Sequence, residues 1–101
     1  MNLKSILQNF TYVYSQEKAE KLKKERWINI QTIIDKLKNY QICQVLPNHN
    51  YEDQIYILVK CKLSNQDYPV LVPIKIIENK QEVVIKTAFP SRKFKDLISN
   101  C

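Results

Sequence analysis

The chain has 101 residues, a length that fits one domain over residues 1–101 and leaves little room for a second. Lysine and arginine outnumber aspartate and glutamate by 16 to 10, so the formal net charge is +6. This charge favours an anionic partner without choosing among nucleic acid, a membrane surface and an acidic protein. Glycine is absent, which excludes glycine-rich phosphate loops, and the 45% of hydrophobic residues is enough for a modest core.

The first half of the sequence predicts three helices and one short strand. Apolar residues at helical spacing indicate a helix over residues 3–10, and the aromatic and β-branched run at 10–14 is typical of a strand. Ser15 is placed to cap a helix from Gln16 to about Trp27, which is rich in lysine and has few large apolar residues. A more strongly amphipathic helix follows over residues 30–37.

The second half changes to the alternating pattern of strands. Four such runs, separated by polar turns, lie at residues 40–46, 54–63, 68–77 and 81–88. Pro69 and Pro73 make the third run an edge strand or a bulged one, because proline has no N–H for a ladder. Short links between strands favour antiparallel pairing. We therefore expect an α+β fold, with a twisted antiparallel β-sheet and two to three helices packed on one face.

The cysteines give no metal-site pattern. Cys43, Cys61 and Cys101 are odd in number, have no C-x-x-C spacing, and are accompanied by a single histidine. We expect Cys43 and Cys61 to be small buried thiols and Cys101 to be exposed. No apolar run is long enough to cross a bilayer or to serve as a signal peptide. These features predict a reduced, cytoplasmic protein with no metal, no cofactor and no membrane contact.

The last predicted strand delivers cationic groups to one end of the sheet. Lys86 lies among small and apolar residues, where a lysine is unusual, and it either faces a site or extends to the sheet edge. Beyond Pro90 come a hydroxyl, a guanidinium and an ammonium, from Ser91, Arg92 and Lys93. A guanidinium there suits bidentate phosphate binding, and its alternative is a salt bridge to Asp96 or Glu25. We expect Lys86 and Arg92 to converge on one phosphate.

Two further sets of residues are candidates for nucleic-acid chemistry. His49 belongs to the residue type that changes charge closest to neutral pH, so it is either a proton-transfer group or a polar turn residue. Tyr51 is a candidate for base stacking, or for simple packing at the start of a strand. The basic helix face either grips a phosphate backbone or is only solvated, and it is formed by Lys23, Lys24 and Arg26.

Several of these segments resemble a group of small bacterial proteins. They are Glu25-Arg26 after the lysine-rich helix, Leu71-Val72-Pro73, and above all the run from Ile85 to Lys93. The chain resembles BrnT-type toxins of type II toxin–antitoxin systems, within the RelE-like ribonuclease superfamily, over about Phe10 to Lys95. It departs from the family pattern at Trp27, where glycine is usual, and in the turn Pro-Asn-His-Asn, where His-Pro-Asn is more common.

The resemblance implies a metal-independent endoribonuclease that cleaves RNA and is silenced by a cognate antitoxin. It assigns the family's basic strand residue to Lys86 and its arginine to Arg92. With the reasoning above, the expected catalytic residues are Lys86, Arg92, Ser91 and His49. The expected RNA-binding residues are Lys23, Lys24, Arg26, Tyr51 and Lys93.

Such an enzyme needs little from the protein beyond charge and orientation. RNA supplies its own nucleophile, the 2′-hydroxyl, and lysine and arginine stabilise the charge that develops on the phosphorane. The alternative function is a non-catalytic basic module that binds nucleic acid or an acidic protein partner. The sequence leaves both open, together with the choice between a homodimer and a toxin–antitoxin heteromer.

Overall fold

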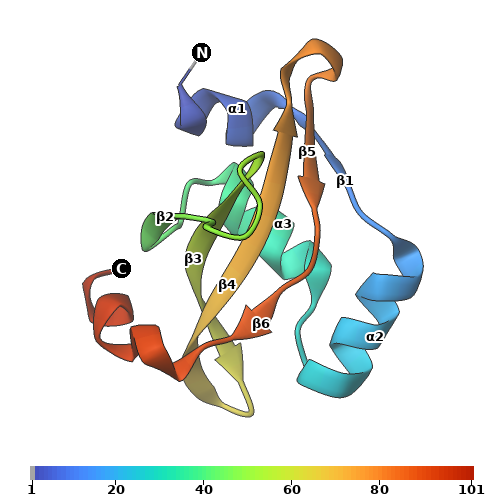
Figure 1. Cartoon of the computed structure of the whole chain (residues 1–101). Coiled ribbons are helices and arrows are strands. Elements are labelled where there is room, and N and C mark those ends of the chain that lie inside the picture. Colours follow the sequence, from blue (N-terminus) through green and yellow to red (C-terminus); the bar gives the residue numbers. More distant parts are fainter. Residues whose placement is uncertain (1) are drawn as a thin grey trace.

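The computed structural model describes residues 2–101 and has an α+β architecture (Figure 1). In chain order its elements are α1 (Leu3–Asn9), β1 (Thr11–Val13), α2 (Gln16–Arg26), α3 (Ile30–Lys38), β2 (Gln44–Pro47), β3 (Gln54–Leu63), β4 (Gln66–Ile77), the 3₁₀ segment η1 (Glu78–Lys80), β5 (Glu82–Ile85), β6 (Phe89–Pro90) and the 3₁₀ segment η2 (Arg92–Asn100). The predicted α+β class is confirmed. Within residues 2–101, no helix has the length and apolar character needed to span a bilayer.

Each α-helix begins with a side-chain cap. A side-chain oxygen accepts a hydrogen bond from a backbone N–H two or three residues later, at Asn2, Ser15 and Asn29. Such a cap satisfies a donor that has no partner inside the helix and typically contributes about 1 kcal/mol. These local signals explain why α2 and α3 begin at the residues that the sequence indicates.

The sheet is mainly antiparallel, as expected, but it is mixed because it contains one parallel pair. Its strand order is β1-β5-β4-β3-β2, and β6 pairs with β4 beyond the end of β5. β1 runs parallel to β5, whereas every other pair is antiparallel. Short links favour antiparallel pairing for β2 to β5 but not for β1, because residues 14–81 lie between β1 and its partner β5.

β4 lies in the middle of the sheet, so of the two alternatives for this strand the edge strand is wrong. The carbonyl groups of Pro69 and Pro73 accept hydrogen bonds from the N–H groups of Ser91 and Lys86, at 2.9 and 3.0 Å. The N–H and C=O of one strand residue point to the same side, so the N–H groups that proline lacks would face β5 and β6. The ladder to β3 is therefore complete, and the ladder on the other side is interrupted at residues 86–88. Pro73 does lie beside an incomplete ladder, as predicted.

The predicted strand over residues 81–88 is consequently two short strands joined by a break. Lys86 is partly exposed one residue beyond β5, whereas Ala88 is fully buried against the helices, so the two side chains lie on different faces. Nη1 of Arg26 donates a hydrogen bond to the carbonyl of Ala88 at 2.8 Å. This bond ties the end of α2 to the break, and Figure 1 shows α2 beside the segment that joins β5 to β6.

One face of the sheet is covered by α1, α2 and α3. A single cluster joins the buried residues of these helices to alternate residues of β3, β4 and β5, among them Leu7, Leu22, Ile33, Leu37, Ile57, Val72 and Val83. Full burial of one such side chain contributes about 1.5–3 kcal/mol. From α2 only Ala19 and Leu22 are buried, so this helix leaves most of its surface to solvent, as its composition predicts.

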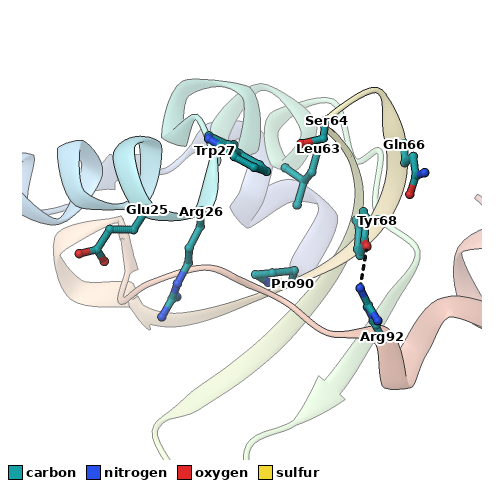
Figure 2. Close-up of a pocket in the computed structure, with 9 residues that line it drawn as sticks. All are labelled: Glu25, Arg26, Trp27, Leu63, Ser64, Gln66, Tyr68, Pro90 and Arg92. Carbon is teal, nitrogen blue, oxygen red and sulfur yellow. Dashed lines mark hydrogen bonds between the residues drawn. The ribbon is translucent and has the colours of Figure 1, made fainter.

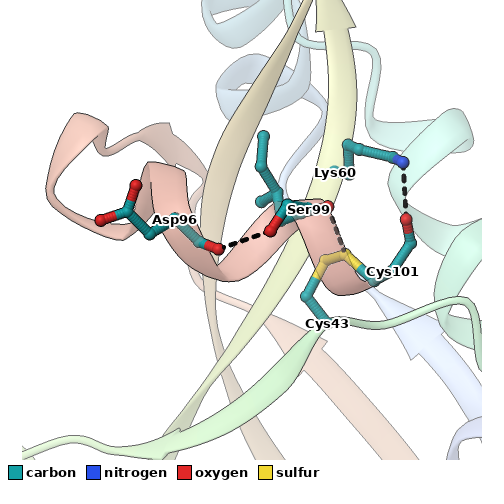
Figure 3. Close-up of a disulfide and its surroundings, with 6 residues drawn as sticks. Cys43, Lys60, Asp96, Ser99 and Cys101 are labelled. Atoms are coloured by element: carbon teal, nitrogen blue, oxygen red, sulfur yellow. Dashed lines mark hydrogen bonds between the residues drawn. A yellow bond between two sulfur atoms is a disulfide. The ribbon is translucent and has the colours of Figure 1, made fainter.

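The opposite face is covered only in part, by η2. Leu58, Leu71 and Ile98 are buried there, outside the helix-side cluster. At the end of η2 a disulfide joins Cys101 to Cys43 (Figure 3). The expectation of a reduced chain is therefore wrong for this pair, whereas Cys61 is free and buried as predicted. The two half-cystines lie 58 residues apart, so no local pattern indicates that they meet.

Candidate nucleic-acid interface

A hollow of about 430 Å³ surrounds Lys86 on the sheet face that the α-helices leave open. The rings of Tyr56 and Phe89 line it and meet edge to face, with their centroids 6.3 Å apart. Tyr51, which is 59% exposed, and Lys18 from α2 line it as well. The hollow therefore combines three aromatic rings with two ammonium groups, which is the chemistry that unpaired bases and phosphates require.

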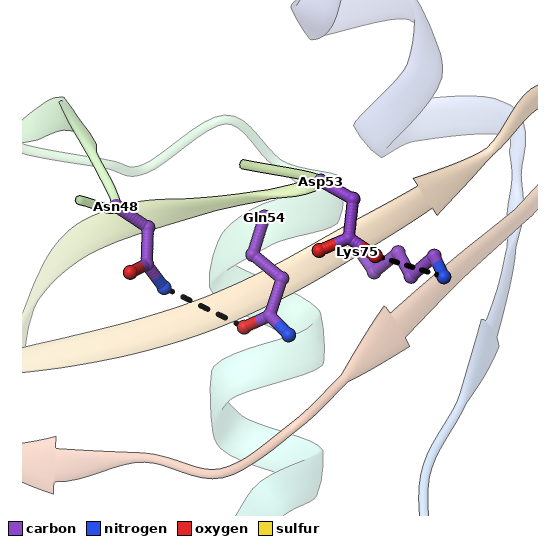
Figure 4. Close-up of polar contacts among 4 residues, drawn as sticks. All are labelled: Asn48, Asp53, Gln54 and Lys75. Atoms are coloured by element: carbon purple, nitrogen blue, oxygen red, sulfur yellow. Dashed lines mark hydrogen bonds and ion pairs between the residues drawn. The ribbon is translucent and has the colours of Figure 1, made fainter. Parts of the chain in front are cut away.

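Asn48 holds the turn that carries Tyr51. Its side chain is only 7% exposed, and its Oδ1 accepts hydrogen bonds from the backbone N–H groups of Asn50 and Tyr51 at 3.0 and 3.2 Å. Its Nδ2 donates a longer bond to Oε1 of Gln54 at 3.5 Å (Figure 4). Both amides line the Lys86 hollow, and sequence reasoning missed them. The available signal was the asparagine at the start of the turn, since asparagine commonly bonds the backbone two residues on.

An ion pair lies at the edge of the same region. Nζ of Lys75 lies 3.0 Å from Oδ2 of Asp53 (Figure 4). The hydrogen bond from Lys75 lowers the pKa of the Asp53 carboxyl below its ordinary value, and the charge of Lys86 adds to this effect. Asp53 is therefore ionised at neutral pH and offsets the charge of Lys75, so Lys75 is less available to a phosphate than Lys86 is.

Three further hollows continue from the Lys86 hollow along α2 and η2, and each shares lining residues with the next. Lys18 and Thr87 link the first to the second, Arg26 links the second to the third, and Arg92 links the third to the fourth. We call these four hollows the basic trough. Its cations are Lys86, Lys18, Lys21, Arg26, Arg92 and Lys95, and its carboxylates are Glu25 and Asp67.

The trough brings some predicted site residues together and separates others. Lys86 lines one hollow with Tyr51, and Arg26 lines another with Arg92. Lys86 and Arg92 share none of the four hollows, so these hollows do not bring the two groups together. Arg92 instead donates from Nη2 to the Tyr68 hydroxyl at 3.3 Å, and within residues 2–101 it forms no salt bridge. The break at residues 86–88 and strand β6 lie between these two cations.

Other predicted residues line none of the four hollows, namely Ser91, His49, Lys23, Lys24 and Lys93. His49 is exposed in the turn after Asn48, and Lys23 and Lys24 are exposed on α2. The ammonium of Lys93 lies 5.4 Å from the centroid of the Phe94 ring.

Sequence reasoning missed Lys18 and Lys21. They lie three residues apart and are therefore neighbours on the surface of α2. Arg26, the last residue of the helix, lines the same hollow as both of them. The spacing of Lys18 and Lys21 can be read from the sequence, but the sequence does not show which side of α2 faces the break at residues 86–88.

The arrangement is suited to binding an extended anion that carries aromatic groups. Within residues 2–101, no group of three or more His, Cys, Asp or Glu side chains is placed to hold a metal ion. Comparison of the chain with protein-family models, with curated proteins and with solved structures finds no match in any of the three.

Proposed function

We propose that the chain binds single-stranded RNA along the basic trough. The observation that carries this proposal is the continuity of four hollows lined by six cations, with exposed or partly exposed aromatic rings around Lys86. Proteins that bind single strands combine a cationic groove, which follows the backbone, with aromatic rings on which bases stack. An acidic protein or a membrane surface would satisfy the cations but would make less use of the rings beside them.

The two kinds of group have separate roles in this proposal. Lys86 and Lys18 bind phosphates, and their contribution weakens as salt rises because condensed counterions are released on binding. Tyr51 stacks on a base, and a stacking contact of this kind is typically worth about 1–3 kcal/mol. Asn48 keeps the Tyr51 backbone in place, so it acts on binding through the position of that ring.

The salt dependence of RNA affinity tests the proposal. For about four neutralised phosphates, the log–log slope of the binding constant against salt is about −3. Fluorescence anisotropy with a labelled single-stranded RNA measures this slope. Lys18→Ala should make it shallower by about 0.7, whereas Lys24→Ala, a matched change on the same helix outside the trough, should leave it unchanged. Absence of binding at low salt, or binding that does not respond to salt, would contradict the proposal.

RNA cleavage by a toxin of a toxin–antitoxin system is a second candidate function, and one observation favours it beyond the resemblance. Lys86, Lys18 and Tyr51 line one hollow, so two ammonium groups are available to one phosphate beside a tyrosine. In the proposed step the 2′-oxygen bonds to phosphorus and the 5′-oxygen leaves, while one proton departs from the 2′-hydroxyl and one is supplied to the leaving oxygen. The ammonium groups stabilise the additional negative charge of the phosphorane. Arg92 lies outside this hollow and is assigned to binding.

Single-turnover cleavage with saturating protein separates the two functions. If the chain cleaves RNA, Lys86→Ala should lower the bound-state rate about 10²-fold, whereas Arg92→Ala should weaken affinity and leave that rate nearly unchanged. Expression of the active chain should then arrest growth, co-expression of a cognate antitoxin should relieve the arrest, and Lys86→Ala should abolish it. If the folded chain binds RNA but cuts none, the binding function stands alone.

A further inference from the structure

Trp27 is unusual in both its backbone and its exposure. It follows α2 with φ 57° and ψ 27°, a left-handed conformation that glycine adopts freely and a residue with a Cβ does not. Its side chain is 69% exposed, more than any other large hydrophobic residue that the structure describes. A large ring left in solvent contributes little to the core, so its exposure makes Trp27 a candidate for binding.

The Trp27 ring lies beside the third hollow of the trough, which has a volume of about 470 Å³ (Figure 2). This volume lies within the range of small-molecule sites, so the hollow can admit a nucleotide-sized group. Figure 2 shows the ring on one side of the hollow, near Leu63, and the hydrogen-bonded pair of Tyr68 and Arg92 on another side. Arg26 extends from the same helix end as Trp27, so a stacking surface and two guanidinium groups line one hollow.

The protein positions both guanidinium groups without using all of their donors. Nη1 of Arg26 donates to the carbonyl of Ala88 at 2.8 Å, and Nη2 of Arg92 donates to the hydroxyl of Tyr68 at 3.3 Å. Each guanidinium has five N–H donors in a fixed plane, so each retains a pair suited to a phosphate. Glu25 lines the same hollow, but in Figure 2 its carboxylate points away from the Trp27 ring.

We infer that this hollow is a nucleotide subsite of the trough, in which Trp27 stacks on one base and Arg26 and Arg92 bind the phosphates beside it. The inference rests on the RNA-binding function proposed above and adds to it a second stacking position, separate from Tyr51. Each base inside a single strand has a backbone phosphate on either side of its nucleotide, and the subsite offers two guanidinium groups together with one aromatic ring. Base stacking on an aromatic ring requires an unpaired base, so double-stranded RNA should not occupy this subsite.

Tryptophan fluorescence tests the subsite directly, because Trp27 is the single tryptophan of the chain. A short single-stranded RNA with a terminal label is titrated into the full chain, and RNA anisotropy and tryptophan emission are followed together. The expected result is that emission is quenched with the same midpoint as the anisotropy change. A duplex of the same sequence should give an anisotropy change without comparable quenching.

Two substitutions distinguish stacking from a structural role. Trp27→Gly removes the ring and relieves the left-handed backbone, so this variant should melt no lower than the parent and yet bind RNA about tenfold or more weakly. Trp27→Phe keeps an aromatic face and should restore most of the affinity. Val45→Ala, at an exposed hydrophobic residue outside the trough, should leave RNA affinity unchanged.

The outcomes separate the inference from the function on which it rests. If RNA binds by anisotropy while emission stays constant and Trp27→Gly keeps the parent affinity, the subsite is wrong and RNA binding stands. If neither signal responds at low salt, the proposed function fails and the subsite fails with it. If Trp27→Gly melts well below the parent, the ring has a structural role and the inference is overturned.

Discussion

The two faces of the sheet are built from the same strands but differ in how far they are covered. Along β3, Ile57 and Val59 face the three α-helices and are fully buried, whereas their neighbours Tyr56 and Lys60 face the other way and stay partly exposed. Side chains alternate along a strand, so a single run builds a core on one side and a partly exposed surface on the other. The difference between the faces lies in their cover: three helices close one, and η2 covers only part of the other.

The largest effect should come from the helix-covered face. Leu37 is fully buried there, so Leu37→Ala leaves a cavity and should lower the free energy of unfolding by about 2–5 kcal/mol. Val45→Ala, at an exposed residue of β2, should change it by about 0.5 kcal/mol or less. Urea denaturation of both variants measures the contrast. Equal losses would show that Leu37 is not packed in the core as described.

A smaller effect should come from the disulfide that holds η2 on the open face. Cys43 and Cys101 are separated by 58 positions in the sequence. Breaking their disulfide, by reduction or by Cys43→Ser, should lower the free energy of unfolding by about 2–4 kcal/mol. RNA affinity should be retained, because the N–H of Ser91 bonds to Pro69 and Arg92 bonds to Tyr68 independently of the disulfide. Denaturation and RNA titrations with and without reductant test both statements. A large loss of affinity on reduction would make the covered part of this face a component of the binding site.

A pH-dependent change in stability should come from a buried thiol on the helix-covered face. Burial raises the pKa of the Cys61 thiol from 9.0 to about 11, with a smaller opposing effect from Lys36. A thiol with a raised pKa in the folded state stabilises the fold below pH 9, and this contribution is lost as pH rises from about 9 to about 11. Between pH 8 and pH 10 the parent should therefore lose about 1 kcal/mol more than Cys61→Val does. Parallel losses in the two proteins would place Cys61 in a more solvated environment.

The smallest effect should come from the exposed ion pair of the open face. The pKa of Asp53 is lowered in the folded state, so the pair stabilises the fold above the ordinary carboxyl pKa, and this contribution is lost as pH falls through the lowered value. Both side chains are exposed, so Asp53→Asn should leave the melting temperature nearly unchanged at pH 7. A clear drop would mean that the ion pair is less solvated than its exposure indicates. An NMR titration of the Asp53 carboxyl checks the direction of the shift.

The sequence by itself determined the features that depend on near neighbours. Ser15 starts α2 because its hydroxyl accepts a backbone hydrogen bond three residues later, and the alternation over residues 54–63 matches the bounds of β3. The poor burial of α2 was likewise readable from its lysines. These features need no information beyond a few residues in either direction.

Only the tertiary structure decided which distant groups meet. The parallel pairing of β1 with β5, the break at residues 86–88 and the Cys43–Cys101 disulfide each join segments far apart in the chain. The break separates Lys86 from Arg92, and the docking of α2 beside it brings Lys18 and Lys21 into the trough in place of Lys23 and Lys24. A residue's charge and its phase on a helix are local properties, but the partner that the helix face meets is set by packing against the whole sheet. For this reason the kinds of group in the candidate site were predictable, and their grouping was not.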